Sequence, residues 1–138
     1  MIRAFAILGG EAVTLWDVLK AEGADAFMRE HDEWAHEFAA HDWWFPYTVF
    51  DLRRMGVELF VDDRKEDAVS LFEFAVARHP DVYWLWEILG NIYVAIGDRE
   101  QGVRCLEKAL DLNPNDLYVR NSLNSLTRQD QWCSGRDG

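Results

Sequence analysis

Residues 83–116 read YWLWEILGNIYVAIGDREQGVRCLEKALDLNPND. Apolar residues recur at helical spacing on both sides of Gly97-Asp98, a pair that is typical of a turn. Asp98 and Gln101 have the spacing of a capping box, which marks the start of a second helix. Pro114 lies where that helix must end, because proline keeps the residue before it out of the helical conformation. The stretch therefore predicts two helices joined by a tight turn.

The same arrangement occurs earlier in the chain, over residues 49–82. A shift by the length of the stretch places Leu52–Leu59 on Trp86–Tyr93, with apolar or small residues on apolar or small ones. The chain has three prolines, and they are equally spaced by the same shift: Pro46, Pro80 and Pro114. A fixed period of about 34 residues is typical of helical repeats. Residues 49–82 are therefore predicted to form a second helical hairpin, which turns at Asp62-Asp63.

Capping residues occur at the predicted helix ends. Asp63 and Glu66 have the spacing of a capping box at the start of the second helix in residues 49–82. Thr48 and Asp81 can cap the first helices of the two hairpins.

Small residues lie at equivalent positions of the two hairpins. Gly56 and Ala68 are small in the first, and Gly90 and Gly102 are small in the second. Glycine inside a helix costs about 1 kcal/mol relative to alanine. Its occurrence at matching repeat positions indicates that the two helices of each hairpin approach closely there.

Residues 83–116 resemble the tetratricopeptide repeat, whose signature is W-x-x-L-G-x-x-Y followed by a small residue, an aromatic or leucine, an alanine and a closing proline. The matching residues are Trp86, Leu89, Gly90, Tyr93, Leu106, Ala109 and Pro114. Gly102 departs from the usual alanine. Residues 49–82 match with Leu52 for the tryptophan and Leu59 for the tyrosine. The resemblance implies an all-α, right-handed superhelix of about seven helices.

Three further segments flank the two repeats. Residues 1–45 fit the period badly and are interpreted as an N-terminal helical hairpin, a degenerate repeat with helices over 11–22 and 24–42. Residues 117–128 look like the polar-faced helix that caps such arrays, and residues 129–138 are predicted to be a flexible tail. This order also resembles the helical tail of some bacterial serine hydrolases, but none of the four serines lies in S-x-x-K or G-x-S-x-G.

Composition restricts the partners and the compartment. The 138 residues are 49% hydrophobic and 28% charged, as expected for one globular domain. A net charge of −11 disfavours nucleic acid and anionic membranes as partners. The apolar stretch Ala4–Leu8 is too short for a signal peptide, and no apolar run is long enough for a transmembrane helix. Since Cys105 and Cys133 do not suggest a disulfide framework, we expect a cytoplasmic protein.

The histidines at positions 31, 36 and 41 do not have metal-binding spacing. They point about 140° apart on a helix, so they cannot converge on one ion. His31 is predicted to lie at the edge of the core with a hydrogen-bonded partner. A stripe on the same helix is interpreted as a solvated face; it contains Glu30, Glu33, Glu37 and His41. No metal, cofactor or catalytic residue is predicted, and an enzymatic or metal-binding role is the least favoured alternative.

Four aromatic residues cluster between the N-terminal hairpin and the first repeat. The run Trp43-Trp44-Phe45-Pro46-Tyr47 can fill the angle between the two parts. Alternatively, Trp43, Trp44 and Tyr47 form an exposed contact patch, because tryptophan and tyrosine are favoured interface anchors.

The resemblance also implies a concave groove lined by the first helices of successive hairpins. The side chains assigned to the groove are Phe50, Arg53, Val57, Phe60, Trp84, Glu87, Asn91, Val94, Tyr118, Asn121 and Ser125. This lining suits a peptide or helix with apolar anchors, and Arg53 and Asn91 would fix its orientation. Without a lysine, it does not suit a terminal carboxylate.

We therefore expect a non-catalytic module that binds another protein or peptide. One alternative is an obligate structural subunit of a larger assembly, which would use the convex side, the Trp43–Tyr47 patch and the N-terminal segment; a homo-oligomer is a further alternative. Another is that the apolar N-terminus of the chain itself fills the groove.

Overall fold

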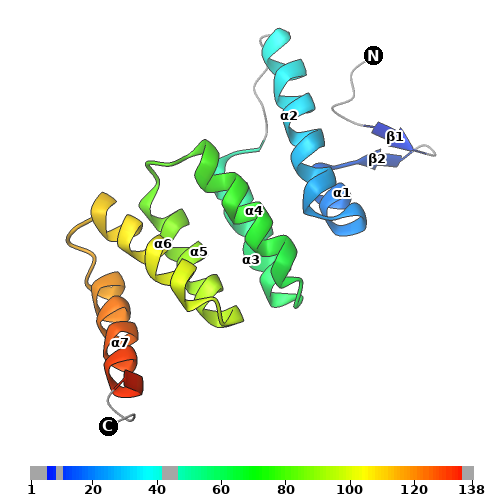
Figure 1. Cartoon of the computed structure of the whole chain (residues 1–138). Coiled ribbons are helices and arrows are strands. Elements are labelled where there is room, and N and C mark those ends of the chain that lie inside the picture. The colour runs from blue at the N-terminus through cyan, green and yellow to red at the C-terminus, as the bar shows by residue number, and fades with distance from the viewer. Residues whose placement is uncertain (1–5, 9–10, 42–46, 135–138) are drawn as a thin grey trace. The chain divides into compact units, whose positions relative to one another are not determined.

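The computed structural model describes residues 6–8, 11–41 and 47–134. The described residues form seven helices and one two-stranded β hairpin (Figure 1). The chain divides into one unit from Met1 to Phe74 and another from Ala75 to Gly138. Helices predominate, as the repeat pattern predicts, and the β hairpin is an addition that the sequence did not indicate.

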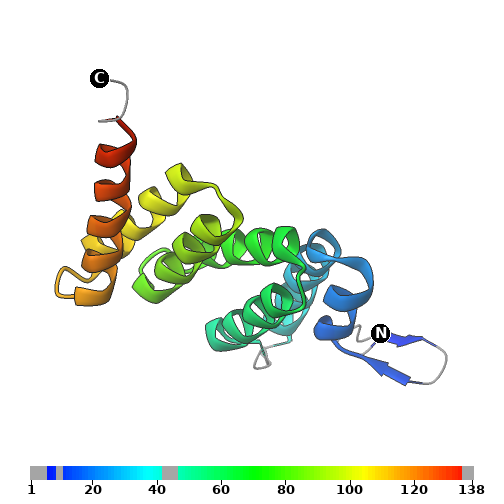
Figure 2. The same cartoon turned by 90° about the horizontal axis from the view of Figure 1, so that it is seen from below.

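The first unit begins with strands β1 (Ala6–Leu8) and β2 (Glu11–Val13), which pair antiparallel and extend from the N-terminal end of α1 (Figure 2). The prediction of a helix over 11–22 is wrong for its first residues, because α1 spans Leu15–Glu22. A capping box sets this start: the Asp17 carboxylate accepts the Thr14 N–H at 2.9 Å, and the Thr14 hydroxyl accepts the Asp17 N–H at 3.2 Å.

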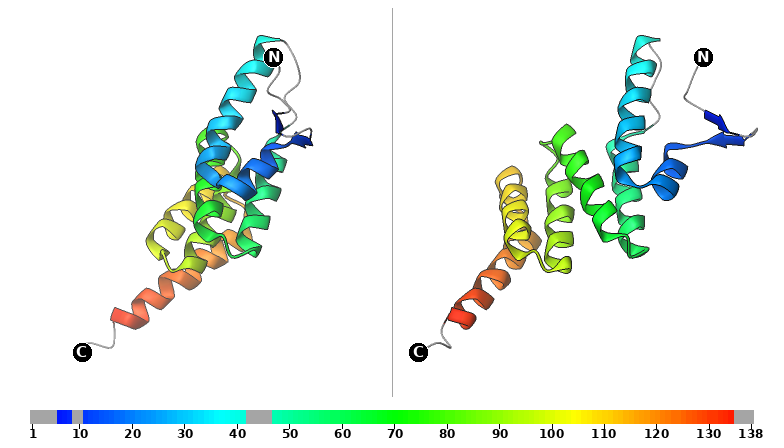
Figure 3. Two further views of the ribbon diagram at one scale, coloured as in Figure 1. Left: turned by 90° about the vertical axis from the view of Figure 1, so that its right-hand side faces the viewer. Right: turned by 45° about the vertical axis from the view of Figure 1, so that its right-hand side comes forward.

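Helix α2 (Ala24–Ala40) follows α1 after Gly23 alone and extends well past it (Figure 3). Gly23 has a φ of +91°, which favours glycine. The buried residues of this hairpin include Leu15 and Leu19 of α1 with Phe27 and Trp34 of α2.

Helix α3 (Val49–Val61) and helix α4 (Lys65–Arg78) form the predicted second hairpin. As predicted, Thr48 is the N-cap residue of α3, and its N–H donates to the Asp51 carboxylate at 2.7 Å. Gly56 lies against the ring of Phe72, where an added Cβ would be 2.7 Å from Cζ. The close approach at Gly56 is confirmed, although Phe72 rather than Ala68 supplies the nearest atoms.

An Arg64–Asp67 pair connects the turn between α3 and α4 to the turn between α1 and α2. The Arg64 guanidinium donates to the carbonyl oxygens of Leu19 at 3.0 Å and Lys20 at 2.9 Å, at the end of α1. It also donates to the Asp67 carboxylate at 2.7 Å. The same carboxylate accepts the N–H of Ala24, at the start of α2, at 3.0 Å. The pair therefore satisfies backbone groups at the end of one helix and the start of the next.

The turn between α3 and α4 corrects one predicted cap. Asp63 has a φ of +63°, and the N–H after it, from Arg64, donates to the Leu59 carbonyl at 2.9 Å. This is the geometry of a left-handed helix end. Asp63 therefore ends α3 instead of forming a capping box with Glu66, and α4 begins at Lys65.

The second unit repeats this turn one period later in the sequence. Helix α5 (Tyr83–Ile96) ends at Gly97, whose φ is +93°, and the Asp98 N–H donates to the Tyr93 carbonyl at 2.9 Å. Helix α6 (Arg99–Leu112) then begins, and Asp98 accepts the Gln101 N–H at 3.2 Å as predicted. The two turns therefore share one backbone design.

We expect Asp63→Gly to stabilise the protein by about 0.5–1 kcal/mol, because an L residue in the left-handed region is strained and glycine is not. The exposed ion pair of Asp63 with Lys65, at 3.1 Å, offsets only a few tenths of this gain. The matched change Gly97→Ala should cost about 1 kcal/mol at the equivalent position. Urea denaturation measures both, and a loss of stability in Asp63→Gly would contradict the prediction.

Small residues bring α5 and α6 together as predicted. An added Cβ on Gly90 would lie 3.0 Å from the Gly102 carbonyl oxygen and 2.8 Å from Leu106 Cγ. Gly90 and Leu106 each follow Gly56 and Phe72 by one period, so the same positions make the contact in both hairpins.

Two further predictions about helix ends are wrong. Val82, not Asp81, precedes α5, and no side chain caps that end. Helix α7 spans Leu117–Ser134, so the tail predicted from residue 129 is helical as far as Ser134. The sequence has no proline or glycine between these bounds that would stop the helix. Residues 135–138 lie outside the described residues.

Helix α7 presents a polar face. Its Val119 is buried with Leu106 and Ala109 of α6. Trp86, Gly90 and Val94 lie inside the α5–α6 hairpin. One period later, the equivalent residues of α7 are exposed and polar: Arg120, Asn124 and Arg128. This pattern agrees with the predicted capping helix. None of the described helices is both long and apolar enough to cross a bilayer.

Candidate functional site

Helix α3 exposes an apolar stripe. Phe50 is 65% exposed, Val57 41% and Val61 75%. These residues are seven and then four positions apart, so they share one side of the helix. We call Phe50, Val57 and Val61 the α3 stripe. Val61 was not among the predicted site residues, although its helical spacing after Val57 was a readable signal.

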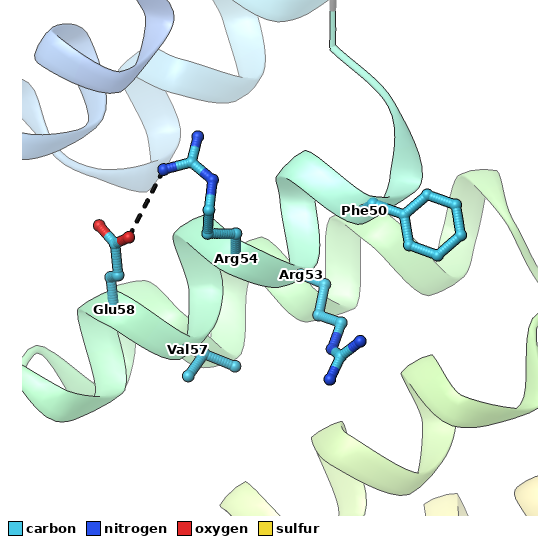
Figure 4. Close-up of a pocket in the computed structure, with 5 residues that line it drawn as sticks. All are labelled: Phe50, Arg53, Arg54, Val57 and Glu58. Carbon is cyan, nitrogen blue, oxygen red and sulfur yellow. Dashed lines mark hydrogen bonds and ion pairs between the residues drawn. The ribbon is translucent and has the colours of Figure 1, made fainter.

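A hollow of about 400 Å³ runs along α3 (Figure 4). Arg53 and Val57 extend from one side of the helix, whereas Arg54 and Glu58 extend from the other. Arg54 lies 3.5 Å from Glu58 in an exposed ion pair. Residues that line the hollow are Phe50, Arg53, Arg54, Val57 and Glu58. The structure thus places three predicted residues, Phe50, Arg53 and Val57, around one hollow, and their role in binding stays a prediction.

The remaining predicted residues lie elsewhere. Phe60 of α3 is half-buried. In the second unit Tyr118 is 60% exposed and Trp84 is half-buried, so neither is sealed in a core. Other half-buried residues on α5 are Glu87, Asn91 and Val94, and the exposed ones on α7 include Asn121 and Ser125.

An aromatic residue occupies the same repeat position three times. Phe50, Trp84 and Tyr118 lie one period apart, each at the second residue of its helix. Each keeps part of its ring accessible. Exposed aromatic side chains are favoured contacts in protein interfaces. Because the three residues recur at one repeat position, a shared role in binding is a prediction that can be tested for all three together.

Tyr47 has a structural contact. It is half-buried, and its phenol oxygen accepts the Leu15 N–H at 3.1 Å. Burial raises the pKa of Tyr47 above its ordinary value of 10.0. The contact supports the structural interpretation of the aromatic run at this residue. The other two residues of the predicted contact patch, Trp43 and Trp44, lie outside the described residues.

We expect the free energy of unfolding to fall as the pH rises above about 10, partly because of Tyr47. Since the folded state holds the phenol proton more tightly than the unfolded state, its contribution is complete below the unfolded pKa and decreases above it. In urea denaturation, the free energy of unfolding of the Tyr47→Phe variant should therefore fall less steeply than that of the wild type as the pH rises above about 10. Identical pH profiles would contradict this.

His31 is buried against two aromatic rings of the core, and the hydrogen-bonded partner predicted for it stays a prediction. Its exposed fraction is 7%, and its ring centroid is 5.6 Å from that of Phe27 and 5.1 Å from that of Phe74. His31 Nδ1 also lies 3.5 Å from an oxygen of Asp32. Among the described residues, no three His, Cys, Asp or Glu side chains are grouped so that they could hold a metal ion.

Negative charge is concentrated in the first unit. Residues 1–74 contain 16 of the 25 acidic residues but only 7 of the 14 basic ones. Arg53 and Arg54 of the α3 hollow are two of those seven. Glu58 also lines the hollow, so the lining carries one net positive charge on an acidic unit.

The comparisons with known proteins agree with the repeat pattern. Residues 83–116 match the Tetratricopeptide repeat family. A stretch of 91 residues, 66% of the chain, is 28% identical to the N-terminal acetyltransferase A complex auxiliary subunit NAA15 of Arabidopsis thaliana. The chain spans only 10% of the length of that protein.

Two solved structures of MamA have a similar fold, each with a TM-score of 0.59. One is 13% identical, and the match covers 85% of this chain and 64% of that chain. An arginine-to-glutamate variant of MamA is 16% identical, with 85% and 80% covered. Identities this low show the fold alone. The described residues therefore have a predominantly helical fold similar to that of MamA, and residues 83–116 match a tetratricopeptide repeat.

Proposed function

We propose that this chain is a non-catalytic adaptor that binds a peptide or helix of another protein through the first helices of its hairpins. Tetratricopeptide repeats are protein-interaction modules, and the chain contains one at residues 83–116. The observation that carries the proposal is the recurrence of partly exposed aromatic residues at one repeat position: Phe50, Trp84 and Tyr118.

The remaining predicted residues have supporting roles in this proposal. In the first unit, apolar side chains of the partner bury Phe50, Val57 and Phe60 on α3. In the second unit, taken by itself, they bury the rings of Trp84 and Tyr118. Arg53 and Asn91 fix the orientation of the partner by hydrogen bonds. The polar frame of the contact consists of Glu87, Asn121 and Ser125, and Val94 lies at its apolar edge.

The test is affinity capture from the native extract with the purified chain as bait. We expect Phe50→Ala/Tyr118→Ala to lose the partner that the wild type captures, since truncation of an aromatic anchor costs more than about 1 kcal/mol. Thermal stability should change little, because both rings are more than half exposed. The matched control Glu107→Ala/Lys108→Ala, at exposed positions of α6, should keep the partner. Equal capture by all three forms would contradict the proposal.

A second candidate function is that of a permanent subunit in a larger assembly. One observation favours it: the relative in Arabidopsis thaliana is an auxiliary subunit of a complex. Size-exclusion chromatography distinguishes the two. A monodisperse monomer supports a reversible adaptor, whereas a stable homo-oligomer or aggregation without a partner supports the permanent subunit.

The cytoplasmic location remains a proposal. It rests on the two cysteines of the sequence, Cys105 and Cys133, which do not suggest a disulfide framework.

A further inference from the structure

We propose that the outer edge of β1 pairs with the same edge of a second copy of this chain, so that two N-terminal β hairpins form one antiparallel sheet. The outer edge is the backbone of Ala6–Leu8 on the side away from β2. The inference adds a weak, reversible self-association to the proposed adaptor function. It does not rest on that function, because it involves neither α3 nor the second unit.

Strand β1 has an open backbone edge within the described residues. Its pairing there is with β2 alone, antiparallel, in the register that places Ile7 opposite Ala12. In an antiparallel pair, residues that exchange both hydrogen bonds with the partner strand alternate with residues whose N–H and C=O groups point to the other edge. A strand of three residues therefore directs at least one N–H and one C=O outward. These groups can bind a further strand.

The hairpin needs a further element to be stable. Both strands have only three residues, and an isolated two-stranded hairpin is at best marginally stable in water. Stability requires more strands or a helix packed against them. Figures 1 and 2 show the strands extending away from α1 and the other helices of the first unit. An added strand is therefore the more direct source of stability.

A second copy of the chain supplies the missing strands in one step. Pairing of β1 with β1 gives the strand order β2-β1-β1-β2, which is more than the minimum for independent stability. A two-fold axis relates the copies, so one surface serves both sides, as in most dimers of identical chains. The outward backbone groups of the two copies then pair with each other. A strand from another protein would add only one strand and leave no symmetric contact.

The residue types of the two strands favour the β1 edge. Strand β1 is Ala-Ile-Leu and contains no charged residue and no proline. Charged residues and proline are among the features that keep a natural sheet edge from pairing. Strand β2 carries Glu11, which would face Val13 of the second copy if β2 paired with itself about Ala12. The edge of β2 is therefore protected by a charge, and the edge of β1 is not.

We expect the association to be weak and to depend on salt. A three-residue edge buries far less than the about 1,000 Å² of a stable specific interface, and each copy has a net charge of −11. Salt screens the repulsion between two acidic chains, whereas the pairing of uncharged strands has no attraction that salt would screen. The dimer should therefore become tighter as the ionic strength rises. A contact that depends on ion pairs would become weaker.

Analytical ultracentrifugation of the full chain tests the proposal from micromolar to millimolar concentrations, at low and at high salt. We expect a monomer–dimer equilibrium whose dimer fraction increases with both concentration and salt. A chain that stays monomeric under all these conditions would overturn the proposal. A dimer that dissociates when the salt is raised would overturn it as well.

Charges placed on β1 locate the contact. In a two-fold pair centred on Ile7, Ala6 lies opposite Leu8 of the second copy. Ala6→Lys/Leu8→Lys puts like charges opposite each other at two places and should raise the dissociation constant about tenfold, and Ala6→Glu/Leu8→Glu should do the same. An equal mixture of the two variants should form a mixed dimer at least as tight as that of the wild type, because opposite charges then face each other. Absence of the mixed dimer overturns the proposal.

Two controls separate this inference from other contacts. Ala12→Lys changes the opposite edge of the hairpin and should not weaken the dimer; circular dichroism checks that each variant keeps its helices. Phe50→Ala/Tyr118→Ala should also keep the dimer while it loses the captured partner, so the two proposals can fail separately. If the chain is monomeric and Ala6→Lys/Leu8→Lys loses the captured partner, the edge of β1 pairs with another protein, and the proposal of a second copy is overturned.

Discussion

Gly90→Val should destabilise the second unit by about 3 kcal/mol, the largest effect that we expect from one substitution. A Cβ at Gly90 would lie 3.0 Å from the carbonyl oxygen of Gly102 and 2.8 Å from Leu106 Cγ. The carbonyl belongs to a helical backbone and cannot move without displacing α6. Overpacking of a rigid contact costs about 1–3 kcal/mol and sometimes more. The small gain in helix propensity over glycine does not offset it.

The control for this prediction is Ala95→Val on the same helix. Ala95 is exposed, so its substitution should cost only the difference in helix propensity, about 0.5 kcal/mol. Urea denaturation followed by circular dichroism compares the two. Equal losses in Gly90→Val and Ala95→Val would show that α5 and α6 are not in close contact at Gly90.

Asp67→Ala should cost about 2–3 kcal/mol, the second largest effect. The substitution removes the acceptor of the Ala24 N–H and the partner of the Arg64 guanidinium at once. Arg64 then remains against the carbonyls of Leu19 and Lys20 without its carboxylate. The two charged side chains are only 30% and 31% exposed, so solvent replaces the lost interactions incompletely.

A double-mutant cycle with Arg64→Ala should give a coupling energy of about 1 kcal/mol or more, since the two residues share one network. Glu58→Ala is the matched control. Its pair with Arg54 joins side chains that are 56% and 45% exposed at 3.5 Å, and its loss should cost less than about 0.5 kcal/mol. Additive effects of Arg64→Ala and Asp67→Ala would contradict a shared network.

The repeats and their contacts could be predicted because the sequence period reports them directly. Gly56 and Gly90 had to lie at close contacts, since a larger residue at either would separate the helices. The turn at Asp63 could not be read in the same way. Its spacing from Glu66 suggested a cap, whereas packing of the hairpin required the left-handed conformation that Gly97 adopts in the next repeat.

The N-terminal hairpin shows why the period was lost there. Thr14 and Thr48 lie one period apart, and both begin a helix with a capping box. Helix α1 then has 8 residues against 13 in α3, so α2 starts early and Trp34 no longer corresponds to the small Ala68. The first helix is in register with the repeats, and the second is not.

The candidate site was predicted only in part, for a related reason. The repeat pattern indicates which positions of a first helix face outward, and Phe50, Arg53 and Val57 do line one hollow. It does not indicate how far along the helix an apolar surface continues. Val61 was overlooked, although its position four residues after Val57 places it on the same side of α3.

The polar residues Arg120, Asn124 and Arg128 of α7 have a consequence for protein engineering. A further repeat fused after α7 would contact these charged and amide side chains, whereas its own apolar face needs an apolar partner. Designers who wish to lengthen this scaffold should instead duplicate the 83–116 cassette internally and leave the existing terminus in place.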